Sequence, residues 1–347
     1  MKYEMLSTDR QRNYNLDLIR IIACFAVVGL HVCGKDISVV NTVWYYLCGF
    51  AVPAFFMASG YILMQRKNIG IEYVAKKYQQ IFKVIFLWGT LASMIVLIKG
   101  MICAEDWELI IWNIIKQMMG GVIQKGAFSQ FWFLGALMLV YTMLPLLIAL
   151  SRKKQVVVWL FFLIVGEMLQ IISIHSEFPI QREVIQTFRI WTWIQYFLLG
   201  GFMYVVNRYL HKFSTVIHML LLIVWTVGLM SYQFYMGSYV INSEIGMVQY
   251  AEFFYDSIFE IIWLILLFSL VLKLRFSIVY NDLIEKISPS VMGIYIIHIL
   301  VLRVIKHFVK VHDFCGSVIL YIMVLSVSFF AVKIMWKFEC SRKFVKL

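Results

Sequence analysis

Long apolar stretches alternate with short polar segments along the whole chain, and this pattern predicts a bundle of membrane-spanning helices. A helix needs about 20 apolar residues to cross the hydrocarbon layer of a bilayer. We therefore expect an all-α integral membrane protein with about ten transmembrane helices, whose ends the sequence places only to within a few residues. The ten stretches lie near residues 16–34, 43–64, 81–101, 131–150, 155–174, 190–207, 216–236, 253–272, 290–309 and 317–337.

Ten spans place both termini on the same side of the membrane, and the distribution of Lys and Arg indicates which side that is. The segments on the side of the termini hold about 20 of these residues, whereas the opposite segments hold about 7. Basic residues collect in the cytoplasmic loops of membrane proteins. We therefore expect both termini in the cytoplasm.

The composition excludes several classes of protein. The chain of 347 residues is 62% hydrophobic and 14% charged, with a mean hydropathy of +0.84. A soluble domain is nearer half apolar and a quarter charged, so a soluble enzyme and a disordered protein are excluded. Basic loops account for the net charge of +12, and no nucleic-acid partner is expected. The six cysteines form no CxxC pair, which predicts free thiols and no metal site.

The longest segment between spans, residues 102–130, contains apolar residues at helical spacing that stop at Gly120 and Gly121. This pattern predicts an amphipathic helix near 107–119 that lies on the outer membrane interface or packs over the mouth of a cavity. No segment is long enough to form a separate soluble domain. We therefore treat residues 1–347 as a single transmembrane domain.

Ionisable residues inside the first span are the best candidates for chemistry, because buried charges are costly in a membrane. Arg20 and His31 lie on nearly the same face, about 20° apart, with an axial separation of about 16 Å. We expect Arg20 near the cytoplasmic face and His31 deeper, past the middle of the membrane. A guanidinium suits a phosphate-bearing ligand, and an imidazole suits general-base work on a hydroxyl. Alternatively, Arg20 snorkels to the interface and His31 only bonds another helix.

The first span resembles the opening of membrane-bound acyltransferase family 3, the bacterial O-acyltransferases, whose signature is an arginine, ten residues and a histidine. Four further segments resemble parts of that family in the same order. They are PAFFMASGY at 53–61, FWFLGALMLVYTMLPLL at 131–147, YFLLGGFMYVV at 196–206 and SPSVMGIYIIHILVL at 288–302. The resemblance covers nearly the whole chain and implies ten spans in a bacterial cytoplasmic membrane, with both ends inside.

This resemblance implies transfer of an acyl group, in the first instance acetyl, from cytosolic acyl-CoA to a hydroxyl of an extracytoplasmic or lipid-linked carbohydrate. Acetyl-CoA is then a co-substrate, and no permanently bound cofactor is expected. His31 matches the family's essential histidine and would act as a general base or as a transient acyl carrier. Arg20 matches the paired arginine. Asp17 precedes it by one turn and is placed to orient its guanidinium through an ion pair.

The acyl-CoA site is expected to combine Arg20 with basic residues after the second span. The family often has an Arg-x-x-Arg pattern there, and this chain departs from it by offering lysines. Lys76, Lys77 and Lys83 are therefore the candidates for the CoA phosphates, as point charges without bidentate geometry. The competing interpretation is that basic residues in this loop only set the topology.

The acceptor site is expected to include Trp132, Arg189, Asp256 and Glu260. The two carboxylates lie four residues apart in the eighth span and share a face, which suits hydrogen bonds to sugar hydroxyls. Glu260 would also orient His31 if the two helices meet. The competing interpretations are interfacial carboxylates and, near Arg189, tryptophans that anchor the helix in the interface. A lone histidine in the ninth span, His298, is expected to serve helix packing.

A second interpretation is a transporter or flippase for a glycan or a small polar substrate, because buried charges also line transport pathways. The chain has four prolines and no inverted repeat, which favours the acyltransferase. Because no outer domain is present to grip a polymer, we expect a small or lipid-linked acceptor. Membrane lipids surround the protein, and the oligomeric state stays open, with a homodimer as one option.

Overall fold

The computed structural model describes residues 12–34, 37–176, 180–237 and 250–345. In these ranges the chain forms helices and turns without any β-strand, which confirms the all-α fold class. Eight helical stretches of the described residues are long and apolar enough to cross a membrane. Two further expected spans form the helices α9 (Ile190–Leu210) and α11 (Ile258–Lys273). They are not among the eight because α11, with 16 residues, is too short and because polar side chains lower the hydropathy of α9.

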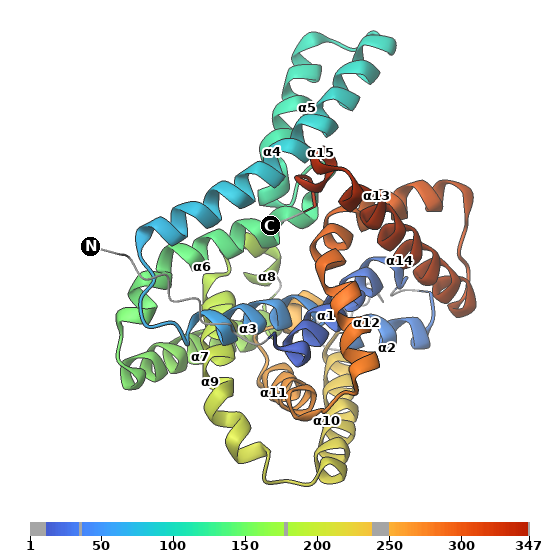
Figure 1. The fold of residues 1–347 in the computed structure, drawn as a ribbon. Helices are drawn as coiled ribbons and strands as arrows, with labels where there is room; N and C mark the ends of the chain where they lie inside the picture. The colour runs from blue at the N-terminus through green and yellow to red at the C-terminus, as the bar shows by residue number, and fades with distance from the viewer. Residues whose placement is uncertain (1–11, 35–36, 177–179, 238–249, 346–347) are drawn as a thin grey trace.

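Helix α1 (Tyr14–Val32) runs through the middle of the bundle (Figure 1). The side chain of Asn13 caps its first turn by accepting a hydrogen bond from the backbone of Leu16. Along its length α1 contacts α3 (Ala51–Leu63), α11, α13 (Val291–Phe308) and α14 (Phe314–Lys337). Polar side chains of α1 are therefore surrounded by protein on several sides.

Helices α3 and α9 pack with their backbones almost in contact. A Cβ atom on Gly60 would overlap the carbonyl oxygen of Phe197, and one on Gly200 would overlap that of Met57. Small residues allow such close crossings in membrane bundles. The two segments that meet here, 53–61 and 196–206, are both among those that resemble the acyltransferase family.

The amphipathic helix predicted near 107–119 is confirmed as α5 (Trp107–Met119). It forms a hairpin with α4 (Ile71–Ile102), in which Ile110 packs against Gly100. Figure 1 shows this hairpin projecting from the rest of the bundle. The chain then returns through two short 3₁₀ helices, η1 (Gly120–Ile123) and η2 (Ser129–Phe131).

The remaining helices complete the bundle and its connections. They are α2 (Val39–Leu47), α6 (Trp132–Ala149), α7 (Arg152–Ile174), α8 (Ile180–Glu183), η3 (Gln186–Phe188), α10 (Thr215–Tyr235), η5 (Ala251–Phe254), α12 (Ile278–Ile287), η6 (Ser288–Ser290) and α15 (Glu339–Arg342). Helices α7, α10 and α14 lie at the periphery and expose most of their apolar side chains. Such faces suit contact with lipid chains.

Candidate active site: two cavities along one helix

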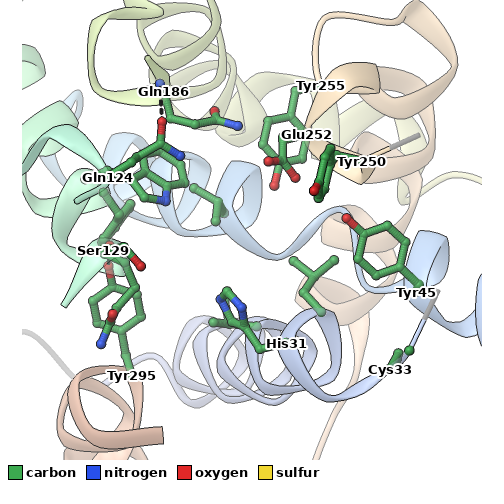
Figure 2. A pocket seen from close by; sticks show the side chains of 17 residues that line it. His31, Cys33, Tyr45, Gln124, Ser129, Gln186, Tyr250, Glu252, Tyr255 and Tyr295 are labelled. Atoms are coloured by element: carbon green, nitrogen blue, oxygen red, sulfur yellow. Dashed lines mark hydrogen bonds between the residues drawn. The ribbon is translucent and has the colours of Figure 1, made fainter. Parts of the chain in front are cut away.

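His31 lies in the last turn of α1 and faces a cavity of about 450 Å³. Its side chain stays accessible, although it is inside the bundle, because the cavity opens beside it. In Figure 2, Gln124 and Ser129 lie across this space from Tyr45, Tyr250 and Glu252. Amide and aromatic side chains dominate the lining: Gln124, Gln130, Gln186, Trp132, Phe133, Tyr45, Tyr250, Tyr255 and Tyr295.

Arg20 lines a second cavity, of about 460 Å³. Lys77 from α4 lines the same cavity, so two basic side chains from different helices share one space. The other lining residues with hydrogen-bonding side chains are Ser59, Gln80, Tyr141, Ser288 and Trp336. A guanidinium beside an ammonium is a favourable environment for phosphate groups.

Phe133, in the first turn of α6, lines both cavities. Its ring is nearly buried and packs edge-on against Phe56 at 5.2 Å and against Tyr295 at 5.5 Å between ring centroids. One aromatic side chain therefore belongs to the wall between the space beside His31 and the space beside Arg20.

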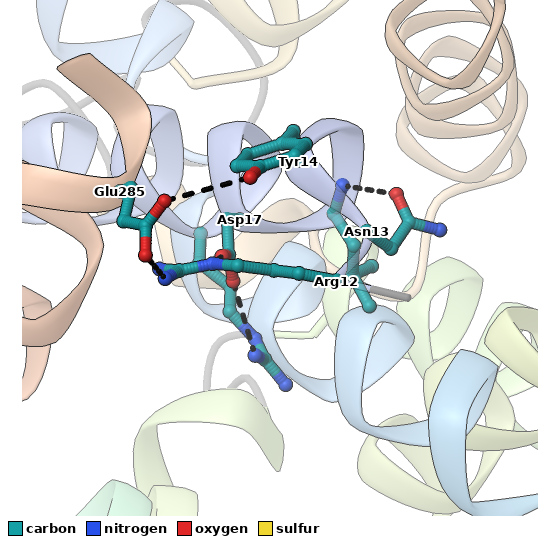
Figure 3. Close-up of polar contacts among 7 residues, drawn as sticks. Arg12, Asn13, Tyr14, Asp17 and Glu285 are labelled. Carbon is teal, nitrogen blue, oxygen red and sulfur yellow. Dashed lines mark hydrogen bonds and ion pairs between the residues drawn. The ribbon is translucent and has the colours of Figure 1, made fainter. Parts of the chain in front are cut away.

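Asp17, in the first turn of α1, forms ion pairs with two arginines. Its Oδ1 lies 3.7 Å from Nη1 of Arg20, which is the ion pair expected from their spacing. Its Oδ2 lies 2.7 Å from Nε of Arg12, and Arg12 also reaches Glu285 of α12 at 3.2 Å (Figure 3). Sequence reasoning missed Arg12 and Glu285, because one lies before the span and the other is far away in the chain.

His31 also has a histidine neighbour, His298 of α13. The two imidazole ring centroids lie 5.2 Å apart, with the ring planes tilted by 43°. His298 is fully buried. The sequence predicted a helix-packing residue at this position, and the structure brings that residue to the candidate catalytic imidazole.

Of the four candidate acceptor residues, Trp132 lines the His31 cavity. Asp256 is buried elsewhere and accepts hydrogen bonds from Thr192 at 2.6 Å and Trp191 at 3.1 Å. Glu260 is also buried and accepts a hydrogen bond from Gln233 of α10 at 3.1 Å. Asp256 lies in the turn before α11, so the common helix face expected for the two carboxylates is not formed. They contact α9 and α10 respectively, and neither lines the His31 cavity.

Arg189 precedes α9, and its buried guanidinium binds backbone carbonyls. It donates to Gln181, to Val184 at 3.0 Å and to Glu252 at 3.2 Å. It lines a third cavity of about 340 Å³ that shares Gln124, Gln186, Tyr250 and Glu252 with the His31 cavity. Arg189 therefore links the backbone of residues 181–184 to that of Glu252 beside this third cavity. Most of its guanidinium N–H groups already donate to these carbonyls.

The three lysines expected at the donor site divide between two sides of α4. Lys77 lines the Arg20 cavity, whereas Lys76 and Lys83 are exposed and belong to neither cavity lining. The reason is helical geometry. Lys76 and Lys83 are seven residues apart and point within about 20° of each other, whereas Lys77 is turned by about 100° from Lys76. The structure thus brings Arg20 and Lys77 together and leaves Lys76 and Lys83 on the exposed side of α4, away from both cavities.

Sequence reasoning missed the amides that line the His31 cavity, Gln124, Gln130 and Gln186. They lie in short connections at the ends of helices, where no periodicity indicates a common direction. Tyr295 was missed as well, although it belongs to a segment, 288–302, whose resemblance to the acyltransferase family was a usable signal.

Comparison with known proteins identifies a family for this chain. A family model described as an acyltransferase domain matches residues 13–333. No curated protein and no solved structure gives a match. The matched region contains the whole described lining of the His31 cavity, and it includes Arg20, Lys77 and Phe133.

Proposed function

This chain belongs to acyltransferase family 3, and from that premise we propose that it is a membrane O-acyltransferase. It moves an acyl group, in the first instance acetyl, from cytosolic acyl-CoA to a hydroxyl of an extracytoplasmic or lipid-linked carbohydrate. It works in the bacterial cytoplasmic membrane with both termini inside. The observation that carries the proposal is the pair of cavities along α1, one beside Arg20 and the other beside His31.

The Arg20 cavity receives the acyl-CoA. Arg20 and Lys77 face the phosphates, and the ion pair with Asp17 holds the guanidinium in place. Asp17 also pairs with Arg12, so its negative charge is shared and Arg20 keeps positive charge for a ligand. The long pantetheine arm then extends along α1 towards Phe133, which lines both cavities.

The His31 cavity receives the acceptor. Its volume of about 450 Å³ lies in the range of small-molecule sites. The amides of Gln124, Gln130 and Gln186 supply donors and acceptors for sugar hydroxyls, and Trp132 offers an apolar ring face. This lining favours a small, hydroxyl-rich acceptor.

The reaction joins the two cavities at Phe133. As the acceptor oxygen attacks the thioester carbon, His31 takes the hydroxyl proton, and the carbon–sulfur bond breaks. The CoA thiolate leaves and is protonated, with the imidazolium as the proton source, so ester and thiol are formed in equal amounts. If His31 instead carries the acyl group, the same cavities serve two successive transfers through an acyl-imidazole.

A transporter also needs spaces on both sides of a barrier, so the experiment must separate transfer from transport. Membranes containing wild type, His31→Ala or His218→Ala receive labelled acetyl-CoA and an extract of envelope glycans and lipids. His218 is a matched control, since it is a buried histidine on α10 that lines neither cavity. We expect CoA release and labelled glycan or lipid with wild type and His218→Ala, and neither with His31→Ala. Equal labelling by wild type and His31→Ala would overturn the proposal, as would the absence of CoA release from wild type.

A further inference from the structure

The hydrogen bonds of His298 define which of its ring nitrogens carries the proton. Its Nδ1 lies 2.7 Å from the carbonyl oxygen of Tyr295 and 3.1 Å from that of Ile294. A carbonyl oxygen only accepts hydrogen bonds, so Nδ1 must be protonated and Nε2 must hold the lone pair. This Nε2 atom is buried and has no hydrogen-bond partner in the described structure. A buried, unpaired acceptor is costly, so a donor from a neighbouring side chain would stabilise it.

Two polar side chains of this region, Tyr295 and Gln130, already donate hydrogen bonds to backbone carbonyls. The hydroxyl of Tyr295 donates to the carbonyl of Gln130, and the side-chain amide of Gln130 donates to the carbonyl of Ile296. The ring of His31, 5.2 Å away between centroids, is the neighbouring group with an N–H still to donate. At this separation of the two rings, a hydrogen bond between one nitrogen of His31 and Nε2 of His298 is geometrically feasible.

We propose that His298 is a positioning residue for His31. Its Nε2 accepts the N–H of one His31 nitrogen, and this fixes the tautomer in which the other nitrogen presents its lone pair to the cavity. The same bond stabilises the imidazolium that forms when His31 takes a proton. The sequence assigned this orienting role to Glu260, which is bound to Gln233 instead. An orienting partner of this kind raises the basicity of a histidine and holds its ring in place.

The orientation can be measured without acyl-CoA or acceptor, by the rate at which diethyl pyrocarbonate modifies His31 at neutral pH. The reagent acylates the nitrogen that carries the lone pair, and mass spectrometry reports the rate for each histidine. Because His31 is accessible from its cavity, it should react in the wild type. His298→Leu removes the acceptor, His298→Gln supplies an amide oxygen that can accept the same N–H, and His218→Leu is the matched buried control.

We expect His298→Leu to slow both modification of His31 and acetyl transfer by about ten-fold or more. His298→Gln should restore both to within a few-fold of wild type, and His218→Leu should change neither. Thermal unfolding in detergent identifies a misfolded variant, and His298→Met replaces the leucine variant if that one misfolds. Equal rates for the leucine and glutamine variants, or an unchanged His31 rate in His298→Leu, would overturn the proposal.

The catalytic meaning of this pair rests on the proposed function, and the two can fail separately. If wild type transfers no acyl group but the His31 rate depends on residue 298 as described, the pairing is supported and the proposed function is overturned. If wild type transfers acetyl while the His31 rate ignores residue 298, the proposed function stands and the pairing is overturned.

Discussion

Arg20 and His31 are held by the same helix, yet their side chains line two different cavities. Under the proposed function, the guanidinium contacts the phosphates of the donor, and the imidazole acts on the acceptor hydroxyl. Their axial separation of about 16 Å suits a donor whose phosphates lie far from its thioester. Each residue can be tested through a different step, one through binding of the donor and the other through chemistry.

Replacing Arg20 with lysine should weaken donor binding more than turnover. Lysine keeps the charge but loses the planar guanidinium that binds a phosphate through two hydrogen bonds. We expect the KM for acetyl-CoA to rise about ten-fold, since loss of part of a charge-assisted contact costs about 1.4 kcal/mol or more. Titration of CoA release with acetyl-CoA measures this effect. The matched control is Lys76→Ala, on the exposed side of α4. An equal rise in KM for that variant would contradict the assignment of Arg20 to the donor site.

Asp17→Asn should disturb the Arg20 cavity through the shared carboxylate. The substitution weakens the contacts to Arg12 and to Arg20 together, so the guanidinium loses its orientation. We expect a several-fold rise in the KM for acetyl-CoA. Glu285→Gln is the control, because it weakens the contacts of residue 285 to Arg12 and Tyr14 and leaves the Asp17–Arg20 ion pair in place. If both variants raised the KM equally, Asp17 would act through Arg12 alone.

Phe133→Trp should reduce transfer while leaving donor binding near that of wild type. The larger ring adds bulk in the wall between the two cavities, where the proposed function has the thioester meet the hydroxyl. Overpacking of this kind costs about 1–3 kcal/mol of stability, so thermal unfolding must be measured in parallel. Phe133→Leu, which is smaller, should retain transfer. A tryptophan variant that is folded and fully active would contradict a meeting point at Phe133.

Gly60→Ala should destabilise the fold at the contact between α3 and α9. Its methyl group would overlap the carbonyl oxygen of Phe197, so the two helices would have to move apart. We expect a clear fall in the melting temperature in detergent. Gly228→Ala on α10 is the control, because a Cβ there meets no atom within 4 Å and alanine favours the helix by about 0.5–1 kcal/mol. Equal changes in melting temperature would show that the close crossing is unimportant.

The sequence predicted features that depend on one helix at a time. Span lengths follow from hydropathy, α5 follows from its apolar periodicity, and the common face of Arg20 and His31 follows from 100° per residue. The placement of Trp132 at the His31 cavity agrees with its position in a segment that resembles the acyltransferase family.

Features that depend on which helices meet were beyond the sequence. Periodicity places Glu260 on a face but does not say that the face meets Gln233 of α10. His298 in α13 lies beside His31 in α1, although the two helices are near opposite ends of the sequence. The sequence names Lys83 as a candidate for the CoA phosphates, and the structure places it on the exposed side of α4. Helix faces are local properties, whereas neighbours are set by the packing of the whole bundle.

Centrally, the Arg20 cavity is proposed to bind the donor, and His31 is proposed to act in acyl transfer. Measuring acetyl-CoA binding and acetyl transfer on the same purified variants tests this separation. We predict that Arg20→Ala weakens binding of labelled acetyl-CoA and, at low donor concentration, transfer as well. His31→Ala should bind acetyl-CoA as wild type does and transfer nothing. If His31→Ala lost binding as severely as Arg20→Ala, or if Arg20→Ala bound normally, the two residues would not serve separate sites and the account would be contradicted.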